Sequence, residues 1–67
     1  MTYDVVQKVN GNLVIVSSWP DNKAGAKGAY HKRLDLLYSD AETTSGYVAL
    51  LDDNLDVVDG LKEEIIK

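Results

Sequence analysis

The residues of this chain that could do chemistry are mostly charged, and the two signs of charge are separated along the sequence. Residues 21–33 hold four cations and one acid, a net charge of +3, while residues 34–67 hold nine acids and two lysines, a net charge of −7. Clustered cations bind phosphate, and clustered carboxylates bind cations or the basic sites of other proteins. The sequence therefore offers two candidate binding segments of opposite charge.

The basic segment reads KAGAKGAYHKR from residue 23 to residue 33. Its cations could neutralise phosphates while its tyrosine stacks on an exposed base, as in proteins that bind single-stranded nucleic acid. The alternative is that these residues keep a surface segment solvated and balance the acidic half of the chain. The predicted contacts to phosphate or to an acidic partner are Lys23, Lys27, Tyr30, Lys32 and Arg33.

The acidic half of the chain could occupy the nucleic-acid site of a DNA- or RNA-processing enzyme. The Lys and Arg side chains that hold phosphate in such a site also hold carboxylate. The alternative is a solvated turn followed by a helix start, where aspartate is common. The predicted partner-binding residues of this acidic surface are Asp52, Asp53, Asp56, Asp59, Glu63 and Glu64.

Metal binding and catalysis are not expected. Four oxygen-bearing residues fall at positions 1, 3, 5 and 12 of a calcium-binding EF-hand loop that would begin at Asp52, but Val57 stands where that loop needs glycine. His31 is the only histidine and cysteine is absent, so ligands for zinc and partners for a catalytic triad are missing. We expect no metal, no cofactor and no enzyme activity.

The composition is that of a globular protein, with 45% apolar and 27% charged residues in a chain of 67. Cysteine is absent, so the composition gives no indication of an oxidising compartment. No apolar run approaches the roughly 18 residues that suggest a membrane span. Asp4 stands where a signal peptide would be basic. We therefore expect one small globular domain over residues 1–67, cytoplasmic and without membrane contact.

The stretch YDVVQKVNGNLVIVSSW predicts a β-hairpin, because β-branched residues dominate both arms and Asn10-Gly11-Asn12 supplies a turn. A three-residue loop would pair Val9 with Leu13 and Tyr3 with Trp19. The second arm contains LVIV, which is apolar on both faces and favours a central strand, and Pro20 should end it. The predicted core face consists of Tyr3, Val5, Val9, Leu13, Ile15 and Trp19.

A second hairpin is predicted over GYVALLDDNLDVVDG, with its turn at residues 52–54. The last residues, DGLKEEIIK, predict a short C-terminal helix with Asp59 as its N-cap and with Leu61 and Ile65 one turn apart.

The segment between the hairpins has two interpretations. As a helix it places Ala26, Tyr30, Leu34, Leu37 and Ala41 on one apolar face, but Gly25 and Gly28 would each cost roughly 1 kcal/mol. As a strand it alternates only over residues 34–38. We narrowly favour a loop over residues 20–28 and a strand over residues 29–38.

The predicted fold class is thus a β-rich α+β domain of two antiparallel hairpins and a middle strand, and the alternative is a helix over residues 28–41 in a ββαββ order. We expect a small acidic, non-enzymatic protein that acts through a protein partner, as an inhibitor or accessory factor presenting its acidic half to a basic site. The alternative is a single-stranded nucleic-acid-binding module that uses the basic segment. A third, structural hypothesis is a homo-oligomer formed through an open sheet edge.

Overall fold

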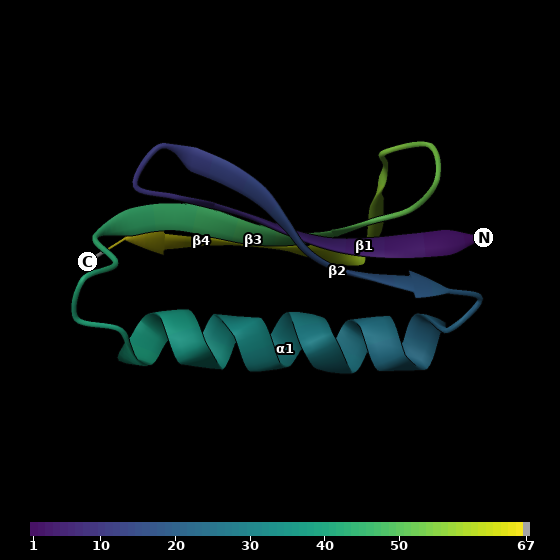
Figure 1. Ribbon diagram of the computed structural model, residues 1–67, viewed down its shortest axis with the longest axis horizontal. Helices are drawn as coiled ribbons and strands as arrows, with labels where there is room; N and C mark the ends of the chain where they lie inside the picture. Colours follow the sequence, from purple (N-terminus) through teal and green to yellow (C-terminus); the bar gives the residue numbers. More distant parts are fainter. Residues whose placement is uncertain (67) are drawn as a thin grey trace.

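Four strands and one helix follow one another along the chain in the order ββαββ. The elements are β1 (Thr2–Val9), β2 (Asn12–Pro20), α1 (Lys23–Ser39), β3 (Ser45–Leu51) and β4 (Val57–Ile66). The computed structural model describes residues 1–66, with the strands in one antiparallel sheet of order β2-β1-β3-β4 and the helix against one of its faces (Figure 1). The predicted α+β fold class is confirmed, in its ββαββ form.

The first hairpin forms as predicted, but the three-residue loop and the Val9–Leu13 pair are wrong, because Asn12 belongs to β2 and pairs with Val9. Asn10 and Gly11 make a two-residue turn with φ angles of 50° and 87°, which suits a residue tolerant of positive φ followed by glycine. Tyr3 pairs with Trp19, and β2 ends at Pro20, both as expected. A β-bulge between Val5 and Val6 shifts the pairing along the rest of the hairpin.

This bulge corrects the predicted core face. Val5 pairs with Ser17 and Val6 pairs with Ile15, so one residue of β2 is left over between the two pairs. Because successive side chains of a strand point to opposite faces, one extra residue moves all later side chains to the other face. Leu13 and Ile15 therefore lie on the face away from Tyr3 and Val5.

The prediction that LVIV forms a central strand is wrong. Strand β2 lies at the edge of the sheet, next to β1 only. Leu13, Val14 and Ile15 expose 63%, 46% and 66% of their surface. The pattern indicated two apolar faces correctly, but only one of them is covered in the fold.

The middle segment is a helix, so the narrow preference for a strand over residues 29–38 and a loop over residues 20–28 is wrong. Asn22 caps the helix, because its Oδ1 accepts a hydrogen bond from the Gly25 amide at 2.9 Å. Tyr30, Leu34 and Leu37 are buried against the sheet. Burying each such side chain contributes about 1.5–3 kcal/mol, which outweighs roughly 1 kcal/mol for each of two glycines.

The second hairpin is confirmed, with β3 and β4 joined by residues 52–56. The Asp52 side chain shapes this turn by accepting hydrogen bonds from the amides of Asn54 at 2.8 Å and Asp56 at 3.1 Å. The predicted C-terminal helix is wrong, because residues 57–66 form β4, whose pairing brings Ile65 into the core; Lys67 lies outside the described residues. Asp59 is not a helix cap, since it and Gly60 adopt φ angles of 52° and 70° within the strand.

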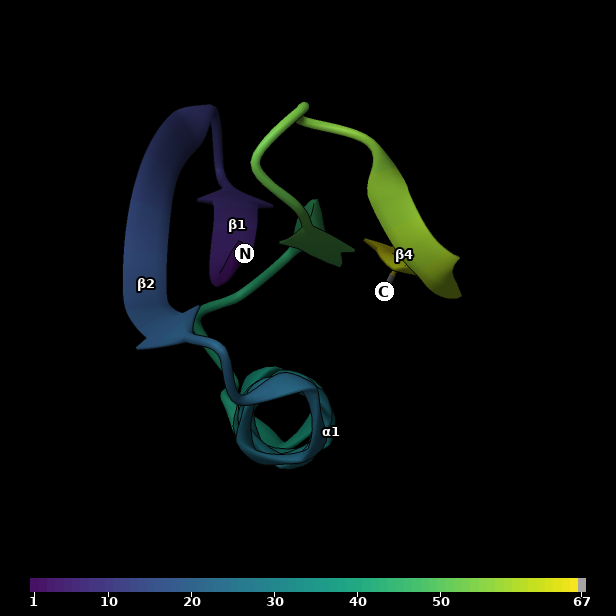
Figure 2. The ribbon, with the colours of Figure 1, turned by 90° about the vertical axis from the view of Figure 1, so that its right-hand side faces the viewer.

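The core fills the space between α1 and the sheet, and Figure 2 shows the helix on one side of the sheet only. Its sheet residues come from three of the four strands, and its helix residues are four of the five in the predicted apolar face. Ala41 falls beyond the end of the helix and is exposed. The buried cluster consists of Val5, Ala26, Tyr30, Leu34, Leu37, Val48, Leu50, Val58 and Ile65.

A matched pair of glycine substitutions tests this arrangement. At Gly46 a Cβ would lie 2.0 Å from the Lys8 carbonyl oxygen of β1, whereas at Gly28 it would have no neighbour within 4 Å. We expect Gly46→Ala to lower the free energy of unfolding by about 2 kcal/mol or more, because backbone must move to relieve the clash. Gly28→Ala should raise it by up to about 1 kcal/mol, as in any exposed helix position. Urea denaturation of both variants measures the difference, and equal shifts would contradict the β1–β3 pairing.

Candidate functional site

The face of the sheet opposite α1 carries no helix or strand among residues 1–66, and we call it the open face. The strand register arranges its central side chains in three rows that run across the sheet. In the first row Asp4 lies between Ser18 and Leu51, and in the second Val6 lies between Ile15 and Ala49.

In the third row Lys8 lies between Leu13 and Tyr47. Strand β4 extends the second row with Lys62 and the third with Glu64. The centre of the open face is therefore apolar, and charged residues stand on both sides of it.

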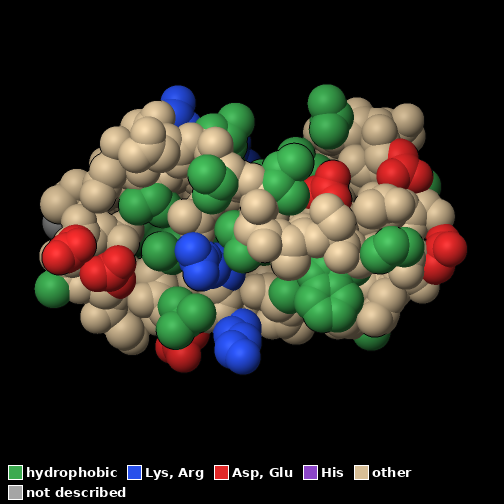
Figure 3. Space-filling view, viewed as in Figure 1, with side chains coloured by type: hydrophobic (Ala, Val, Ile, Leu, Met, Phe, Trp, Pro, Cys, Tyr) green, Lys and Arg blue, Asp and Glu red, His purple; other side chains and the backbone are tan. Residues whose placement is uncertain are grey.

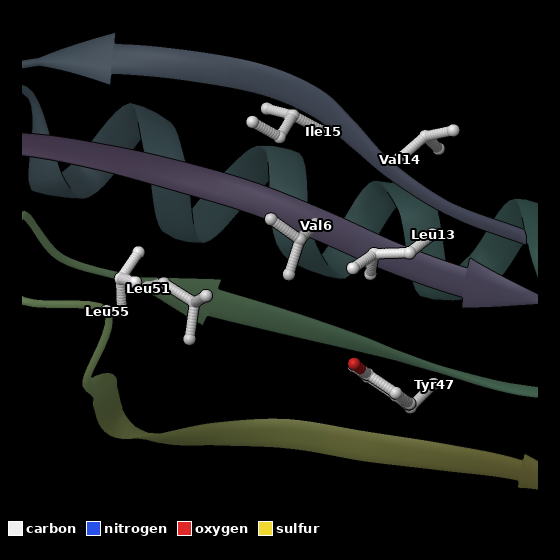
Figure 4. A pocket seen from close by; sticks show the side chains of 7 residues that line it. All are labelled: Val6, Leu13, Val14, Ile15, Tyr47, Leu51 and Leu55. Atoms are coloured by element: carbon white, nitrogen blue, oxygen red, sulfur yellow. The ribbon is translucent and has the colours of Figure 1, made fainter.

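The open face is hollowed into a trough of about 360 Å³. Figure 4 shows side chains of β2, β1 and β3 and of the turn after β3 around one shared space, with the Tyr47 hydroxyl directed toward it. The space-filling view shows the same hollow between two raised parts of the surface (Figure 3). The trough is lined by Val6, Leu13, Val14, Ile15, Tyr47, Leu51 and Leu55.

The exposed apolar side chains of this face are unusual for a sheet in water. An antiparallel sheet that is solvated on one face normally alternates apolar and polar residues along each strand. Here β2 exposes Leu13 and Ile15 on this face, and Leu55 in the neighbouring turn is 73% exposed. Contiguous apolar surface rimmed by polar residues is typical of a site where another macromolecule or a ligand binds.

Charges of opposite sign border the trough at its two ends. Asp4 stands at one end, where the turn between β3 and β4 adds Asp52, Asp53 and Asp56. The Asp53 carboxylate also accepts a hydrogen bond from the Thr2 amide at 3.0 Å, which ties this turn to the start of β1.

Lys8 stands toward the other end, and Lys62, which pairs with Ala49, lies in the central row with Val6. The Lys62 Nζ lies 4.7 Å from the centroid of the Tyr47 ring, a cation–π contact that holds the lysine over the open face. Glu64, which pairs with Tyr47, is the acid at this end.

The structure divides the predicted acidic surface into parts. Asp52, Asp53 and Asp56 lie together in the turn beside the trough. Asp59 instead forms ion pairs with two lysines of α1, and Glu63 accepts a hydrogen bond from the Tyr38 hydroxyl. The six carboxylates therefore do not form one continuous array, and the three in the turn are those placed next to apolar surface.

The predicted basic contacts are distributed around α1. Lys23 and Lys27 lie 3.0 Å and 3.4 Å from the Asp59 carboxylate, and the Arg33 Nε donates to the Gln7 Oε1 at 2.6 Å. Lys32 is exposed, and Tyr30 is 3% exposed in the core. The burial of Tyr30 corrects the prediction that its ring contacts a ligand, because its faces are already packed.

The ion pair of Lys23 and Asp59 affects the titration of both groups. The hydrogen bond and the negative charge of Asp59 raise the pKa of Lys23, and the hydrogen bond and positive charge of Lys23 lower the pKa of Asp59. Lys27 lowers the pKa of Asp59 by a smaller amount. Both side chains are nearly half exposed, so solvent screens the pair and its effect on stability is modest.

The structure brings together no three His, Cys, Asp or Glu side chains that could hold a metal ion within residues 1–66. The EF-hand positions fall in a hairpin turn and a strand, where the Asp52 carboxylate accepts backbone amides. Helix α1 is neither long enough nor apolar enough to cross a membrane.

The residues of the open face were not predicted as a site from the sequence. The available signal was LVIV, whose two apolar faces indicated that something covers each side of β2. No protein-family model, curated protein or solved structure matches this chain. The apolar trough with its charged borders is therefore the observation on which a functional interpretation depends.

Replacing Asp59 by asparagine tests the contact between α1 and β4. Because the folded-state pKa of Asp59 lies below its ordinary value of 3.8, its contribution to stability is complete above that value and is lost as pH falls through the folded pKa. We expect the urea midpoint of the parent protein to fall more steeply on acidification below about pH 5 than that of Asp59→Asn.

Asp56→Asn is the matched control, because the Asp56 side chain makes no ion pair or hydrogen bond with the described residues. It should keep the parental pH dependence. Parallel curves for the parent and Asp59→Asn would contradict a lowered pKa at Asp59.

Proposed function

We propose that this protein is a non-enzymatic protein-binding domain and that its partner docks on the open face. The observation that carries the proposal is the exposure of Leu13 and Ile15 beside a trough whose other residues are also apolar. Each Å² of apolar surface removed from water lowers the free energy by roughly 25 cal/mol, so covering this face with another molecule is favourable.

The arrangement of polar residues supports a protein as the partner. Interfaces between proteins have an apolar centre, commonly with aromatic residues, and a polar rim that stays in contact with water. The open face has this organisation, with Tyr47 in the trough and charged side chains around it. A trough with one hydroxyl and otherwise aliphatic side chains has few groups that could orient a polar small molecule.

The acidic turn has a supporting role in this proposal. Asp52, Asp53 and Asp56 border the trough and would attract a partner that carries basic residues next to apolar ones. Inhibition by imitation of nucleic acid has weaker support, because Asp59 and Glu63 are already engaged within the protein. Such imitation would need carboxylates in a longer continuous array.

Nucleic-acid binding through the basic segment also has weaker support. Two of its four cations, Lys23 and Lys27, already share the Asp59 carboxylate, and Tyr30 is buried. Lys32 and Arg33 remain as the cations that could meet phosphate, and two contacts give little affinity at physiological salt.

Site-specific crosslinking tests the proposed function. We would place the photoreactive amino acid p-benzoylphenylalanine at Ile15 and, as a control, at Leu36, an aliphatic residue on α1 that is 52% exposed. Illumination of cells that contain the protein should give discrete covalent adducts to protein from position 15 and only background from position 36. Adding Leu13→Glu should remove the adducts, since a charge in the trough opposes apolar contact.

Two results would contradict the proposed function. One is the absence of any adduct from position 15, and the other is an adduct that persists unchanged when Leu13→Glu is present. Either would mean that the trough is not the place where a protein docks.

A further inference from the structure

We propose that the occupant of the trough is an α-helix of a partner protein, which lies across the strands with apolar side chains on the floor of the trough and basic side chains toward its acidic end. This inference rests on the proposed function, because it names the kind of segment that docks on the open face. The shape of the trough, the lack of backbone partners on its floor and the charges at its two ends argue for it.

The trough has a recessed floor between two raised ends. The second row forms the floor, where Val6 is 8% exposed and Ala49 is 2% exposed although no helix or strand of residues 1–66 covers them on this face. Leu13 and Tyr47 of the third row stand at one end, and Leu51 stands at the other, next to the turn between β3 and β4 (Figure 4). The low ground between the ends therefore runs across the strands, along the second row.

The dimensions of this low ground suit an α-helix. Successive rows on one face are two residues apart along each strand, so the first and third rows lie about 14 Å apart. An α-helix with its side chains is about 10–12 Å across and fits between them. The molecule measures 34 × 19 × 18 Å and its strands run along the longest axis (Figure 1), so a helix that crosses them needs about 12 residues, or three turns.

The floor offers no backbone partner to a segment that crosses it. The backbone groups of β1 and β3 pair within the sheet, and the side chains that line the trough are aliphatic apart from Tyr47. An extended segment in this place would bury N–H and C=O groups without hydrogen bonds, which is costly. A helix forms its own backbone hydrogen bonds and presents apolar side chains at positions i, i+4 and i+7. The occupant is therefore a helix.

The two ends of the trough differ in charge. Asp4 of the first row stands at the same end as the acidic turn (Asp52, Asp53 and Asp56). Lys8 of the third row stands at the other end, and the Tyr47 ring at that end holds the Lys62 Nζ 4.7 Å from its centroid. Glu64, which pairs with Tyr47, offsets one of these two cations.

This polarity sets the orientation of the partner helix about its own axis. Basic side chains on the flank that faces Asp4 and the acidic turn meet carboxylates, whereas the same side chains on the other flank meet Lys8 and Lys62. Opposite charges at a rim steer a partner into place, and like charges oppose the wrong orientation. Asp4 and Asp56 make no ion pair or hydrogen bond within residues 1–66, so both can receive a basic side chain.

Selection from a peptide library tests the inference. Random peptides of about 16 residues, long enough for four helical turns, are displayed on phage and selected on the full parent protein. Peptides that also bind Ile15→Lys are removed, and circular dichroism should show this variant to be folded because Ile15 is 66% exposed. The remaining peptides depend on the trough. We expect them to carry apolar residues three and four positions apart, to carry Lys or Arg along one flank, and to gain helical signal on binding.

Charge reversal at the acidic end tests the orientation. The Kd of a selected peptide labelled with fluorescein, measured by anisotropy, should rise about tenfold in Asp4→Lys and in Asp56→Lys, because like charges replace opposite ones. Asp35→Lys makes the same change at an exposed position of α1 and should leave the Kd unchanged. Lys8→Gln, at the other end of the trough, should not raise it.

Three outcomes would overturn the basic helix as the occupant. They are the absence of any peptide that depends on the trough, selected peptides that alternate apolar and polar residues as a strand does or that have no excess of Lys and Arg, and a Kd that both charge reversals leave unchanged.

Crosslinking from position 15 separates this failure from that of the proposed function. Adducts to another protein whose yield is the same in Asp4→Lys and Asp56→Lys would leave the proposed function standing and refute the basic helix. Adducts between two copies of the chain would make the occupant a second copy, with the same consequence. The absence of all adducts would refute both proposals.

Discussion

The register between β1 and β2 decides which side chains of this protein are buried and which meet water. One extra residue in β2 opposite the Val5–Val6 step moves Leu13 and Ile15 from the face covered by α1 to the open face. Without it, the aliphatic residues at the hairpin end of β2 would pack beneath the helix. The bulge thus places apolar side chains on the face of the sheet that the helix does not cover. The trough forms between these side chains and those of β1 and β3.

Much of the fold was predictable from local signals, and the failures have a common cause. The Asn10-Gly11 turn, the stop at Pro20 and the polar turn after Leu51 each depend on a few adjacent residues, and all were located correctly. The middle helix and the C-terminal strand depend on distant partners. Gly25 disfavours a helix locally, yet here its missing side chain makes room for the Trp19 ring, which a Cβ would approach to 2.9 Å.

The C-terminal strand shows the same dependence. Leu61 and Ile65 are spaced for a helix, and Asp59 is a good helix cap. Pairing with β3 instead places Ile65 in the core, and the positive φ angles of Asp59 and Gly60 allow the strand to kink where its register with β3 shifts. The candidate site was not predicted for a related reason. A bulge has no signature in the sequence of this hairpin, so the sequence did not show on which face of the sheet Leu13 lies.

The separation of charge along the sequence is largely undone by the fold. Asp59 from the acidic half lies between Lys23 and Lys27 of the basic segment, so part of each segment neutralises the other on the α1 side. The acids that remain beside apolar surface are those of the turn between β3 and β4, together with Asp4. The carboxylates that border the trough are therefore those of this turn and Asp4, while Lys32 and Asp35 remain exposed on α1.

An apolar trough alone would accept many partners, so the charges around it must provide the selectivity. The chain carries a net charge of −4, which favours a partner of positive charge over one of negative charge. The small number of charged residues on the open face thus favours one geometry over the others, which is how polar groups at a rim specify a partner that apolar area by itself does not.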